Sequence, residues 1–471
     1  MSRLIVISNR VSTPKPRSAN GSQGGLAVAL AAALREYRGL WFGWSGEKTD
    51  EYTGQINLHR EDGVTTATID LEEQDVDEYY NGYANRTLWP LFHYRIDLAE
   101  YDRSFGAGYE RVNERFAETV TPLIEPDDLI WVHDYHLIPL GQQLRQRGLR
   151  NRIGFFLHIP WPPQRLLVSL PFHERLVKSM LAYDLIGFHT EEWLESFHHY
   201  VTRELGGSVA ADGTVTVGSR TVKTAAFPIG IDFSEFDKTL ASEETKSAFE
   251  TLKRSAEDKK IIIGVDRLDY SKGLEERFQG YRRFLEENDD WRGRVSFLQI
   301  APPSREEVHT YEAIRERLDE LSGRINGEFA EVDWVPIRYV NQGYPREALA
   351  GFYRASDVAL ITPLRDGMNL VAKEFVASQD PADPGVLILS RFAGAAHQLG
   401  EALLVNPYSK DELSDAIREA LDMPKAERIR RWEKMVDNVR KEDVLAWRRG
   451  FVEALQSVSA EQASDLVPAL E

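Results

Sequence analysis

The side chains best suited to chemistry in this chain directly follow short apolar segments, where buried strands are predicted to end. Those in the first half of the chain are Asn9, Arg10, His133, Asp134, His136, His158, His189 and Thr190. Those in the second half are Asp266, Arg267, Lys272, Arg305, Arg365, Asp366 and Asn369. Arginine and lysine recur in this set although the formal net charge of the chain is -18, which favours a site that collects phosphate groups. The alternative is that these residues are polar only because they lie in surface loops, and that they bind nothing.

Three charged residues of the second half suit the binding of a nucleotide. Arg267 and Lys272 are five residues apart across a turn, so they could converge on one diphosphate and stabilise the charge that develops as it leaves. Glu374 lies about one turn into a predicted helix, where its carboxylate could accept hydrogen bonds from both ribose hydroxyls. A solvated ion-pair network is the alternative for the first two residues, and a helix-dipole preference is the alternative for Glu374.

Two predicted helix N-termini add backbone donors. Gly24 and Gly25 precede the helical segment LAVALAAAL, and glycine lets backbone N–H groups approach a diphosphate or a sugar closely. Gly367 allows a tight turn before a second helix, whose first amides lie near Asn369 and Leu370. Because a glycine pair usually marks an ordinary turn, the second helix is the stronger indication.

Aromatic residues offer faces for stacking on a sugar ring. Tyr79, Tyr80 and Trp89 lie together in the segment DEYYNGYANRTLWPLFHYR. Aromatic residues at this spacing are more often part of a core, so both interpretations are kept.

Two patterns resemble metal sites without completing one. Asp75 and Asp77 lie in an acidic segment typical of a helix N-terminus, so we expect helix capping rather than metal binding. His133 and His136 have a loose ligand spacing, but no further ligand is indicated nearby. We therefore expect no metal.

The apolar segments predict an α/β fold with two parallel sheets. Continuous apolar runs that alternate with helical patterns are typical of strands buried on both faces. These runs are residues 4–8, 129–132, 153–157, 185–188, 261–265, 295–300, 358–362 and 386–390. A length of 471 residues suits two domains with a cleft, and the lapse of the pattern after residue 218 places the boundary near Gly230. Ligands of open parallel sheets bind at the carboxyl ends of the strands, where the polar residues lie.

Composition excludes several classes of protein. The chain has no cysteine, so it has neither disulfides nor a thiolate nucleophile. No apolar stretch approaches the length of a membrane span. The acidic balance disfavours nucleic acid and acidic membrane surfaces as partners, and a phosphate-binding Walker loop and a dinucleotide fingerprint are both absent.

Long motifs across the chain resemble those of trehalose-6-phosphate synthases, from residue 2 to about residue 450. These motifs are SNR, GGLAVAL, GLWFGWSGE, HDYHLIPL, FFLHIPWP, GFHTEE, LDYSKG, INGEF and LRDGMNLVAKEF. The resemblance implies a GT-B glycosyltransferase fold of two Rossmann-like domains facing a cleft. Residues 1–230 would form the acceptor domain and 231–446 the nucleotide-sugar domain. Residues 447–471 would form a C-terminal helix that crosses back to the first domain.

The resemblance also implies roles for individual residues. Glucose 6-phosphate would be held by Arg10, Tyr80, Trp89, Asp134 and Arg305. The donor would be bound by Gly24, Gly25, Arg267, Lys272, Tyr344, Asp366, Asn369, Leu370, Val371 and Glu374. The catalytic set would be Asp134, His158, Arg267, Lys272 and Asp366, with no metal and no cofactor.

The implied reaction moves glucose from UDP-glucose to glucose 6-phosphate and forms trehalose 6-phosphate and UDP. Retention of the anomeric configuration would follow a front-face route, stabilised by the groups around the departing diphosphate. We expect a cytoplasmic enzyme of trehalose biosynthesis, with a role in osmoprotection. A synthase that uses another acceptor, such as glycerol 3-phosphate, and a non-catalytic sugar-phosphate sensor are the alternatives. The nucleoside (UDP, GDP or ADP), the regulation and formation of a homo-oligomer stay open.

Overall fold

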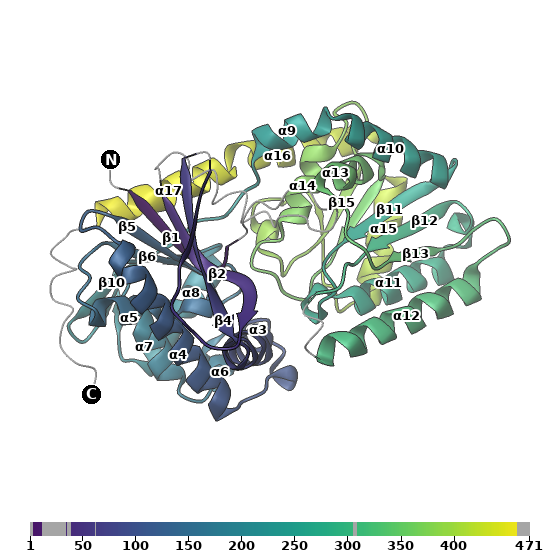
Figure 1. The fold of residues 1–471 in the computed structure, drawn as a ribbon. Helices are drawn as coiled ribbons and strands as arrows, with labels where there is room; N and C mark the ends of the chain where they lie inside the picture. Colours follow the sequence, from purple (N-terminus) through teal and green to yellow (C-terminus); the bar gives the residue numbers. More distant parts are fainter. Residues whose placement is uncertain (1–2, 12–33, 35–38, 62, 305–308, 459–471) are drawn as a thin grey trace. The chain divides into compact units, whose positions relative to one another are not determined.

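A computed structural model describes residues 3–11, 34, 39–61, 63–304 and 309–458. The chain divides into two compact units (Figure 1). The first holds the described residues up to Ile229 together with those from Leu445 on, and the second holds Gly230–Val444. Each unit consists of a largely parallel sheet covered by helices on both faces, as the continuous apolar segments predict.

The sheet of the first unit has the strand order β3-β4-β2-β1-β5-β6-β7-β10-β9-β8. Its strands are β1 Leu4–Arg10, β2 Leu40–Thr49, β3 Asn57–Glu61, β4 Val64–Glu72, β5 Leu129–His133, β6 Ile153–Phe156, β7 Leu185–Phe188, β8 Ser208–Val209, β9 Thr214–Val217 and β10 Arg220–Ala226. The strands from β4 to β10 along this order are parallel, and β3, β9 and β8 pair antiparallel at the two edges. The direction of winding reverses between β1 and β5.

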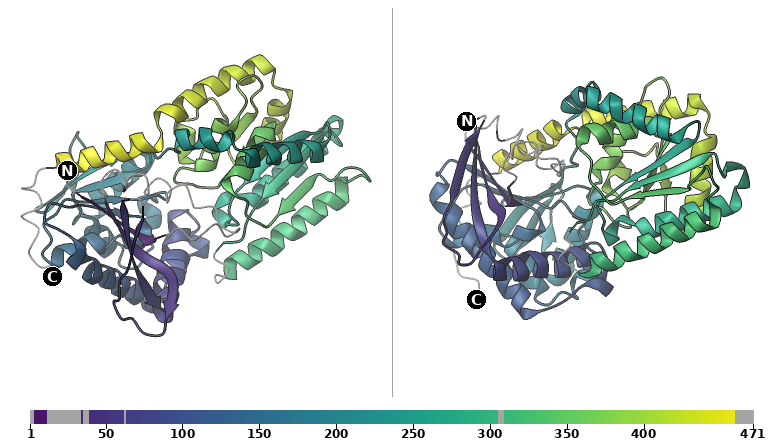
Figure 2. Two further views of the ribbon diagram at one scale, coloured as in Figure 1. Left: turned by 45° about the horizontal axis from the view of Figure 1, so that its top comes forward. Right: turned by 45° about the vertical axis from the view of Figure 1, so that its right-hand side comes forward.

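Helices cover both faces of this sheet. They are α2 Glu73–Asp75, the π-helix η1 Val76–Leu88, α3 Trp89–Phe92, α4 Arg103–Val120, α5 Leu140–Gln146, α6 Gln164–Leu167, α7 His173–Met180, α8 Glu191–Glu204 and α17 Val444–Ser457, with short 3-10 turns η2 Ile96–Leu98, η3 Thr121–Leu123 and η4 Tyr135–Leu137. Helix α17 lies on the face opposite α4, α5 and α7 (Figures 1 and 2). Its Phe451 stacks on Trp131 of β5 with ring centroids 4.5 Å apart, so it completes the core of the first unit.

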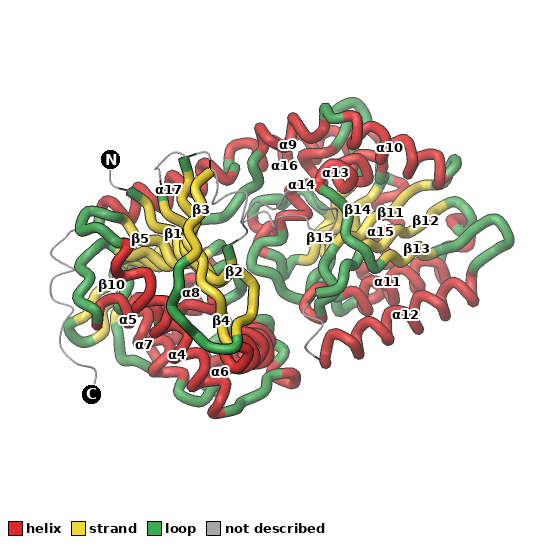
Figure 3. The backbone as a smooth tube through the Cα atoms, in the orientation of Figure 1, coloured by secondary structure: helices red, strands yellow, loops and turns green. Residues whose placement is uncertain are grey.

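The second unit has a six-stranded sheet in the order β13-β12-β11-β14-β15-β16. Its strands are β11 Lys260–Val265, β12 Val295–Ile300, β13 Ile337–Val340, β14 Val358–Ile361, β15 Val386–Ser390 and β16 Leu403–Val405. All neighbours are parallel, and the doubly wound order reverses between β11 and β14. Figure 3 shows the strands of this sheet between two layers of helices.

The helices of this unit form two sets that pack among themselves. One set is α9 Phe233–Leu240, α10 Glu243–Ala256, α13 Arg346–Ala355, α14 Leu370–Ser378 and α16 Lys425–Lys441. The other is α11 Leu274–Glu287, α12 His309–Phe329 and α15 Lys410–Asp422. Short 3-10 turns are η5 Tyr270–Lys272, η6 Asp289–Trp291 and η7 Gly394–His397. Phe278, Phe284 and Leu413 lie in one apolar core with residues of β11, β12, β14 and β15.

Each of the eight predicted strands is a strand of the structure. The observed strands differ from the predicted ones by at most two residues at either end. The confirmed alternation of strands and helices places the polar residues that follow the strands at the carboxyl edge of each sheet. This edge is where open parallel sheets bind ligands.

Candidate functional site

The reversal of winding in the first unit brings the ends of β1 and β5 together. Arg10 ends β1 and Asp134 follows β5, and these strands are direct neighbours. The Arg10 guanidinium lies 5.7 Å from the ring centroid of Trp44 on β2. Gly46 leaves room for it, because a Cβ at this position would lie 2.3 Å from Nη2 of Arg10. The motif GWSGE therefore shapes the surroundings of Arg10, a role that the sequence analysis did not predict.

A row of rings continues from Trp44 towards the end of β5. The Tyr80 ring lies 5.6 Å from Trp44, edge to face, and stacks on His136 at 5.9 Å. Tyr80 is half-buried, whereas Tyr79 is fully buried and its hydroxyl donates to Oδ1 of Asn9 at 2.8 Å. Of the two tyrosines, Tyr80 keeps a partly open face, and Tyr79 belongs to the core.

Trp89 begins α3 and is 5% exposed. Its ring lies 4.1 Å from His93 and 5.7 Å from Tyr135. Two of its neighbours are thus aromatic, and little of its surface is open in this structure. Its predicted contact with a sugar stays a prediction.

Asp134 has a strained backbone at the end of β5. Its φ of 75° and ψ of 167° fall in a region that is favourable only for glycine. Its carboxylate accepts hydrogen bonds from the backbone N–H of Tyr135 at 3.0 Å and of His158 at 3.2 Å. Strain of this kind persists where neighbouring structure enforces it, and it is concentrated at functional sites.

Histidines follow the three adjacent strands β5, β6 and β7. Nδ1 of His133 lies 3.0 Å from Nε2 of His158, and the His158 ring meets that of His189 edge to face at 5.2 Å. Burial lowers the pKa of His133 and of His158 well below the ordinary value, and in each case a neighbouring histidine adds to the effect. Both rings are therefore neutral near pH 7.

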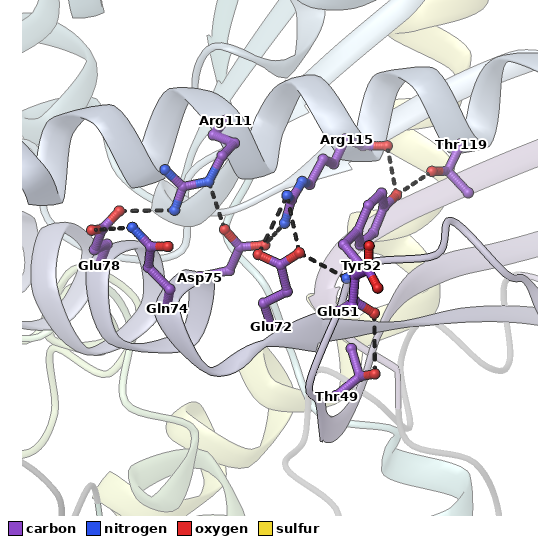
Figure 4. Close-up of polar contacts among 10 residues, drawn as sticks. All are labelled: Thr49, Glu51, Tyr52, Glu72, Gln74, Asp75, Glu78, Arg111, Arg115 and Thr119. Atoms are coloured by element: carbon purple, nitrogen blue, oxygen red, sulfur yellow. Dashed lines mark hydrogen bonds and ion pairs between the residues drawn. The ribbon is translucent and has the colours of Figure 1, made fainter.

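The π-helix that carries Tyr80 is anchored by buried ion pairs (Figure 4). Asp75 is fully buried, and its carboxylate accepts hydrogen bonds from Arg111 at 2.8 Å and from Arg115. Arg111 also reaches Glu78 at 2.8 Å, and Arg115 reaches Glu72 at 3.4 Å. All of these contacts join the segment around η1 to α4.

The expectation that Asp75 caps a helix is wrong. Asp75 does stand at the N-cap position of η1, but its side chain makes no cap hydrogen bond. The Asp75 carboxylate is drawn instead to the two arginines of α4, because a buried charge needs charged partners.

A buried arginine links the strand ends in the second unit. Arg277 of α11 is fully buried and donates to Asp266 at 2.6 Å, to Gln299 at 2.9 Å and to Oγ1 of Thr362 at 3.0 Å. It also donates to the backbone carbonyl of Lys272 at 3.3 Å. These bonds fix the ends of β11 and β14 relative to the Lys272 turn. Arginine is mostly exposed in folded proteins, so nothing in the sequence indicated that Arg277 would be buried.

Lys272 and Asp366 meet where the winding reverses. Nζ of Lys272 lies 2.5 Å from Oδ2 of Asp366, and Nδ2 of Asn369 donates to the same oxygen at 3.1 Å. Asn369 has a φ of 73° and caps α14, because its Oδ1 accepts from the N–H of Ala372 at 3.3 Å. Two loops that were predicted separately thus form one polar cluster.

The loop before α14 packs closely against the loop after β15. Backbone hydrogen bonds join Asp366 to Phe392 and to Gly394. A Cβ on Gly394 would lie 2.0 Å from the carbonyl oxygen of Gly367. Glycine is therefore required at 394 to hold the N-terminal end of α14 in place.

Leu370 and Val371 begin α14, where both are half-buried. Glu374 follows in the same helix, and burial raises its pKa to about 7, with partial opposition from Arg346. The carboxyl group is therefore poised to change its charge near neutral pH.

The remaining predicted residues lie in loops that follow strands of the second unit or outside the described residues. Tyr344 lies in the loop after β13, where its hydroxyl accepts from Gln342 at 2.7 Å and its ring meets Phe352 at 5.1 Å. Arg267 follows β11 and is exposed. Gly24, Gly25 and Arg305 lie outside the described residues.

In the described part of the chain, no group of three or more His, Cys, Asp or Glu side chains is arranged to hold a metal ion. None of the helices in that part is both long enough and apolar enough to cross a membrane.

Comparisons with known proteins cover nearly the whole chain. The model of glycosyltransferase family 20 matches residues 2–457. A trehalose-6-phosphate synthase of Sinorhizobium fredii is 49% identical over 461 residues, which cover 98% of this chain and 99% of that protein.

Two solved structures are similar in fold as well as in sequence. The crystal structure of a UDP-forming α,α-trehalose-phosphate synthase from Burkholderia xenovorans in complex with glucose-6-phosphate matches with a TM-score of 0.92 and 48% identity, over 97% of this chain and 100% of that one. A structure from E. coli bound with UDP-2-fluoro glucose matches with a TM-score of 0.93 and 44% identity, over 97% and 100% of the two chains. The predicted class of two Rossmann-like α/β domains of the GT-B type is confirmed. With its sequence matched from residue 2 to residue 457, this chain belongs to glycosyltransferase family 20.

Proposed function

We propose that this protein transfers glucose from UDP-glucose to glucose 6-phosphate with retention, and forms trehalose 6-phosphate and UDP. The observation that carries this proposal is similarity over 97–98% of the chain to trehalose-6-phosphate synthases at 48–49% identity. Relatives with solved structures bind glucose-6-phosphate in one case and UDP-2-fluoro glucose in another. These two ligands correspond to the acceptor and the donor of the reaction.

The donor is assigned mostly to the second unit. Lys272 and Arg267 bind the diphosphate, and the N-terminal end of α14 adds its backbone N–H groups and the positive end of its dipole. Asp366 contacts the glucose that is transferred, and Glu374 accepts hydrogen bonds from the ribose. The position of Lys272, Asp366 and Asn369 at the β11/β14 reversal supports this assignment, because ligands of doubly wound sheets bind there. Tyr344, Leu370 and Val371 complete the donor set with Gly24 and Gly25.

The acceptor is assigned mostly to the first unit. Arg10 binds the phosphate of glucose 6-phosphate together with Arg305, and Tyr80, Trp89 and Asp134 bind the sugar. The row from Arg10 through Trp44 to Tyr80 supports this assignment, because it joins a cation to rings at the β1/β5 reversal. Cytoplasmic location and a role in osmoprotection belong to the same proposal.

Transfer follows a front-face route. The bond between the anomeric carbon and the diphosphate oxygen breaks, and the hydroxyl of glucose 6-phosphate attacks from the same side. The departing oxygen takes the proton of that hydroxyl, so charge is balanced without a separate base. Lys272, Arg267 and the end of α14 stabilise the charge on the diphosphate, which is the main contribution that preorganised groups make to catalysis.

Product identification tests the proposal. The purified protein is incubated with UDP-, GDP- and ADP-glucose, each combined with glucose 6-phosphate, glucose or glycerol 3-phosphate. We expect trehalose 6-phosphate with both linkages α by NMR, and the fastest turnover with UDP-glucose and glucose 6-phosphate. Equal use of glucose and glucose 6-phosphate would refute the acceptor assignment, and no turnover with any pair would leave only a binding role.

A further inference from the structure

Two consecutive residues at the end of β5 hold His158 at the end of β6. The His133 ring nitrogen Nδ1 lies 3.0 Å from Nε2 of His158, and the Asp134 carboxylate accepts from the His158 backbone N–H at 3.2 Å. Asp134 makes this contact from a backbone conformation with a φ of 75°, which the surrounding structure must enforce. Both the ring and the main chain of His158 are therefore positioned by β5.

One hydrogen bond joins the two imidazole rings, and a single proton lies between the two facing nitrogens. Burial keeps both imidazoles neutral, and a neutral imidazole has one N–H donor and one acceptor nitrogen. At 3.0 Å one nitrogen must donate and the other must accept. The direction of this hydrogen bond decides the tautomer of both histidines.

The direction of this hydrogen bond follows from Nε2, the other ring nitrogen of His133. Nε2 of His133 is buried and has no hydrogen-bond partner in the part of the chain that the structure describes. A buried N–H without an acceptor is rarer than a buried acceptor without a donor. This preference favours an Nε2 without a proton, so that the proton of His133 lies on Nδ1 and is donated to Nε2 of His158.

Aromatic side chains around His133 keep water away from its Nε2 nitrogen. Its ring lies 4.5 Å from the Trp131 ring and 6.3 Å from that of Trp447, and Trp447 also lies 6.0 Å from His158. These indoles cover His133, which is 0% exposed, so water has no access to its second nitrogen. His158 is half-buried. Nδ1 of His158 has no hydrogen bond to any described residue and carries the proton that Nε2 lacks.

We propose that His133 is a positioning residue that fixes His158 as the neutral Nδ1–H tautomer, so that His158 presents a single N–H donor to a hydroxyl group of the transferred glucose. The inference rests on the proposed function, in which His158 contacts that sugar. His133 touches neither substrate in the proposed function, and its role is to determine which His158 nitrogen donates. Donation to a hydroxyl orients the sugar for transfer without adding a charge beside the departing diphosphate.

The tautomer is measured directly in the full-length protein. Long-range ¹H–¹⁵N correlation spectra of ¹⁵N-histidine-labelled protein separate protonated from unprotonated ring nitrogens, and a His158→Gln spectrum assigns the His158 signals. We expect Nδ1 of His158 to be protonated and Nε2 to be unprotonated at pH 7.5 in the unliganded wild type. A proton on Nε2 would overturn the proposal, and this measurement needs no turnover.

Variants at position 133 test the consequence. His133→Phe keeps a buried ring of similar size but removes the donor, so His158 should populate both tautomers and kcat should fall roughly tenfold, the value of one hydrogen bond. His133→Asn keeps an N–H near the place of Nδ1 and should restore most of kcat. KM for glucose 6-phosphate should change in neither variant. An unchanged kcat and an unchanged His158 spectrum in a folded His133→Phe protein would contradict the role.

A matched control is His198, a half-buried histidine in α8 whose Nε2 lies 2.7 Å from Oγ1 of Thr224. His198→Phe should leave both kcat and the His158 spectrum unchanged. If the wild type shows the expected tautomer but forms no trehalose 6-phosphate with any donor, the proposed function fails and the tautomer assignment stands. The two failures are thus distinguishable.

Discussion

Nζ of Lys272 lies 2.5 Å from Oδ2 of Asp366, although the two residues are 94 positions apart in the chain. Their side chains are only 11% and 14% exposed, so the pair is shielded from solvent screening. The lysine is already oriented before a diphosphate arrives, and its carboxylate partner lies where the transferred sugar is assigned. Positioning in advance of binding is what an electrostatic contribution to catalysis requires.

We predict that Lys272→Ala lowers kcat roughly 100- to 1000-fold, the usual effect of losing one group that stabilises a developing charge. Initial rates at saturating UDP-glucose and glucose 6-phosphate measure this effect. KM for glucose 6-phosphate should stay within about twofold of the wild type. Lys441→Ala is the control, because Lys441 is an exposed lysine of the same unit that pairs with Asp437. Near-normal turnover of Lys272→Ala would remove the diphosphate role.

We predict that Gly46→Ala raises KM for glucose 6-phosphate at least about fivefold, because a Cβ would lie 2.3 Å from the Arg10 guanidinium and displace it. The dissociation constant of UDP, measured by calorimetry, should not change. Gly54→Ala is a matched control, since Gly54 also has a positive φ but only the Tyr52 ring lies near its Cβ position, at 3.8 Å or more. Equal KM values for the two variants would show that Arg10 does not bind the acceptor.

We predict that UDP binding strengthens as pH rises through about 7. Burial raises the pKa of Glu374 to about 7, and ribose hydroxyls donate to the ionised carboxylate, so the protonated form below pH 7 binds more weakly. Calorimetry between pH 5.5 and pH 8.5 measures the dissociation constant of UDP. The part of the affinity that comes from Glu374 should fall by up to tenfold for each pH unit below 7. Glu374→Gln should bind weakly with a flatter pH profile. A wild-type profile as flat as that of the variant would refute the ribose contact.

The same titration affects stability with the opposite sign. Because the folded pKa of Glu374 lies above the ordinary value of 4.5, the folded state binds the proton more tightly than the unfolded state does. Its contribution to stability is therefore most favourable below pH 4.5 and is lost as pH rises to about 7. The gain in Tm from Glu374→Gln should be larger at pH 8 than at pH 5.

We predict that Asp75→Asn lowers the free energy of unfolding by about 1–3 kcal/mol, because two arginines lose their shared buried carboxylate. The value lies below that of a fully buried pair because Arg111 and Arg115 are partly exposed. Urea unfolding followed by circular dichroism measures it. Asp77→Asn, at an exposed position of the same segment, should change stability by less than about 0.5 kcal/mol. Equal losses in both variants would mean that the Asp75 cluster does not anchor η1.

The sequence predicted eight of the sixteen strands in the described part of the chain, but not how the residues at their ends are held. Buried parallel strands must be apolar along their whole length, which made all eight segments recognisable. The strands β2, β4 and β10 carry polar residues at many positions, and the edge strands β8 and β9 are short, so their patterns did not predict strands. Arg277 could not be predicted as a buried residue, because its burial depends on Gln299 of β12 and on Asp266 and Thr362, which follow β11 and β14.

By itself the sequence determined the α/β class, the residues that follow each strand and, through long motifs, the family. These properties depend on local patterns of residue type, which the chain displays before it folds. Only the tertiary structure decided that Lys272 meets Asp366, that Asp75 binds two arginines instead of capping a helix, and that His133 faces His158. Such pairings depend on the order of the strands and on burial. Residues distant in sequence therefore set each other's protonation state and hydrogen-bond partners.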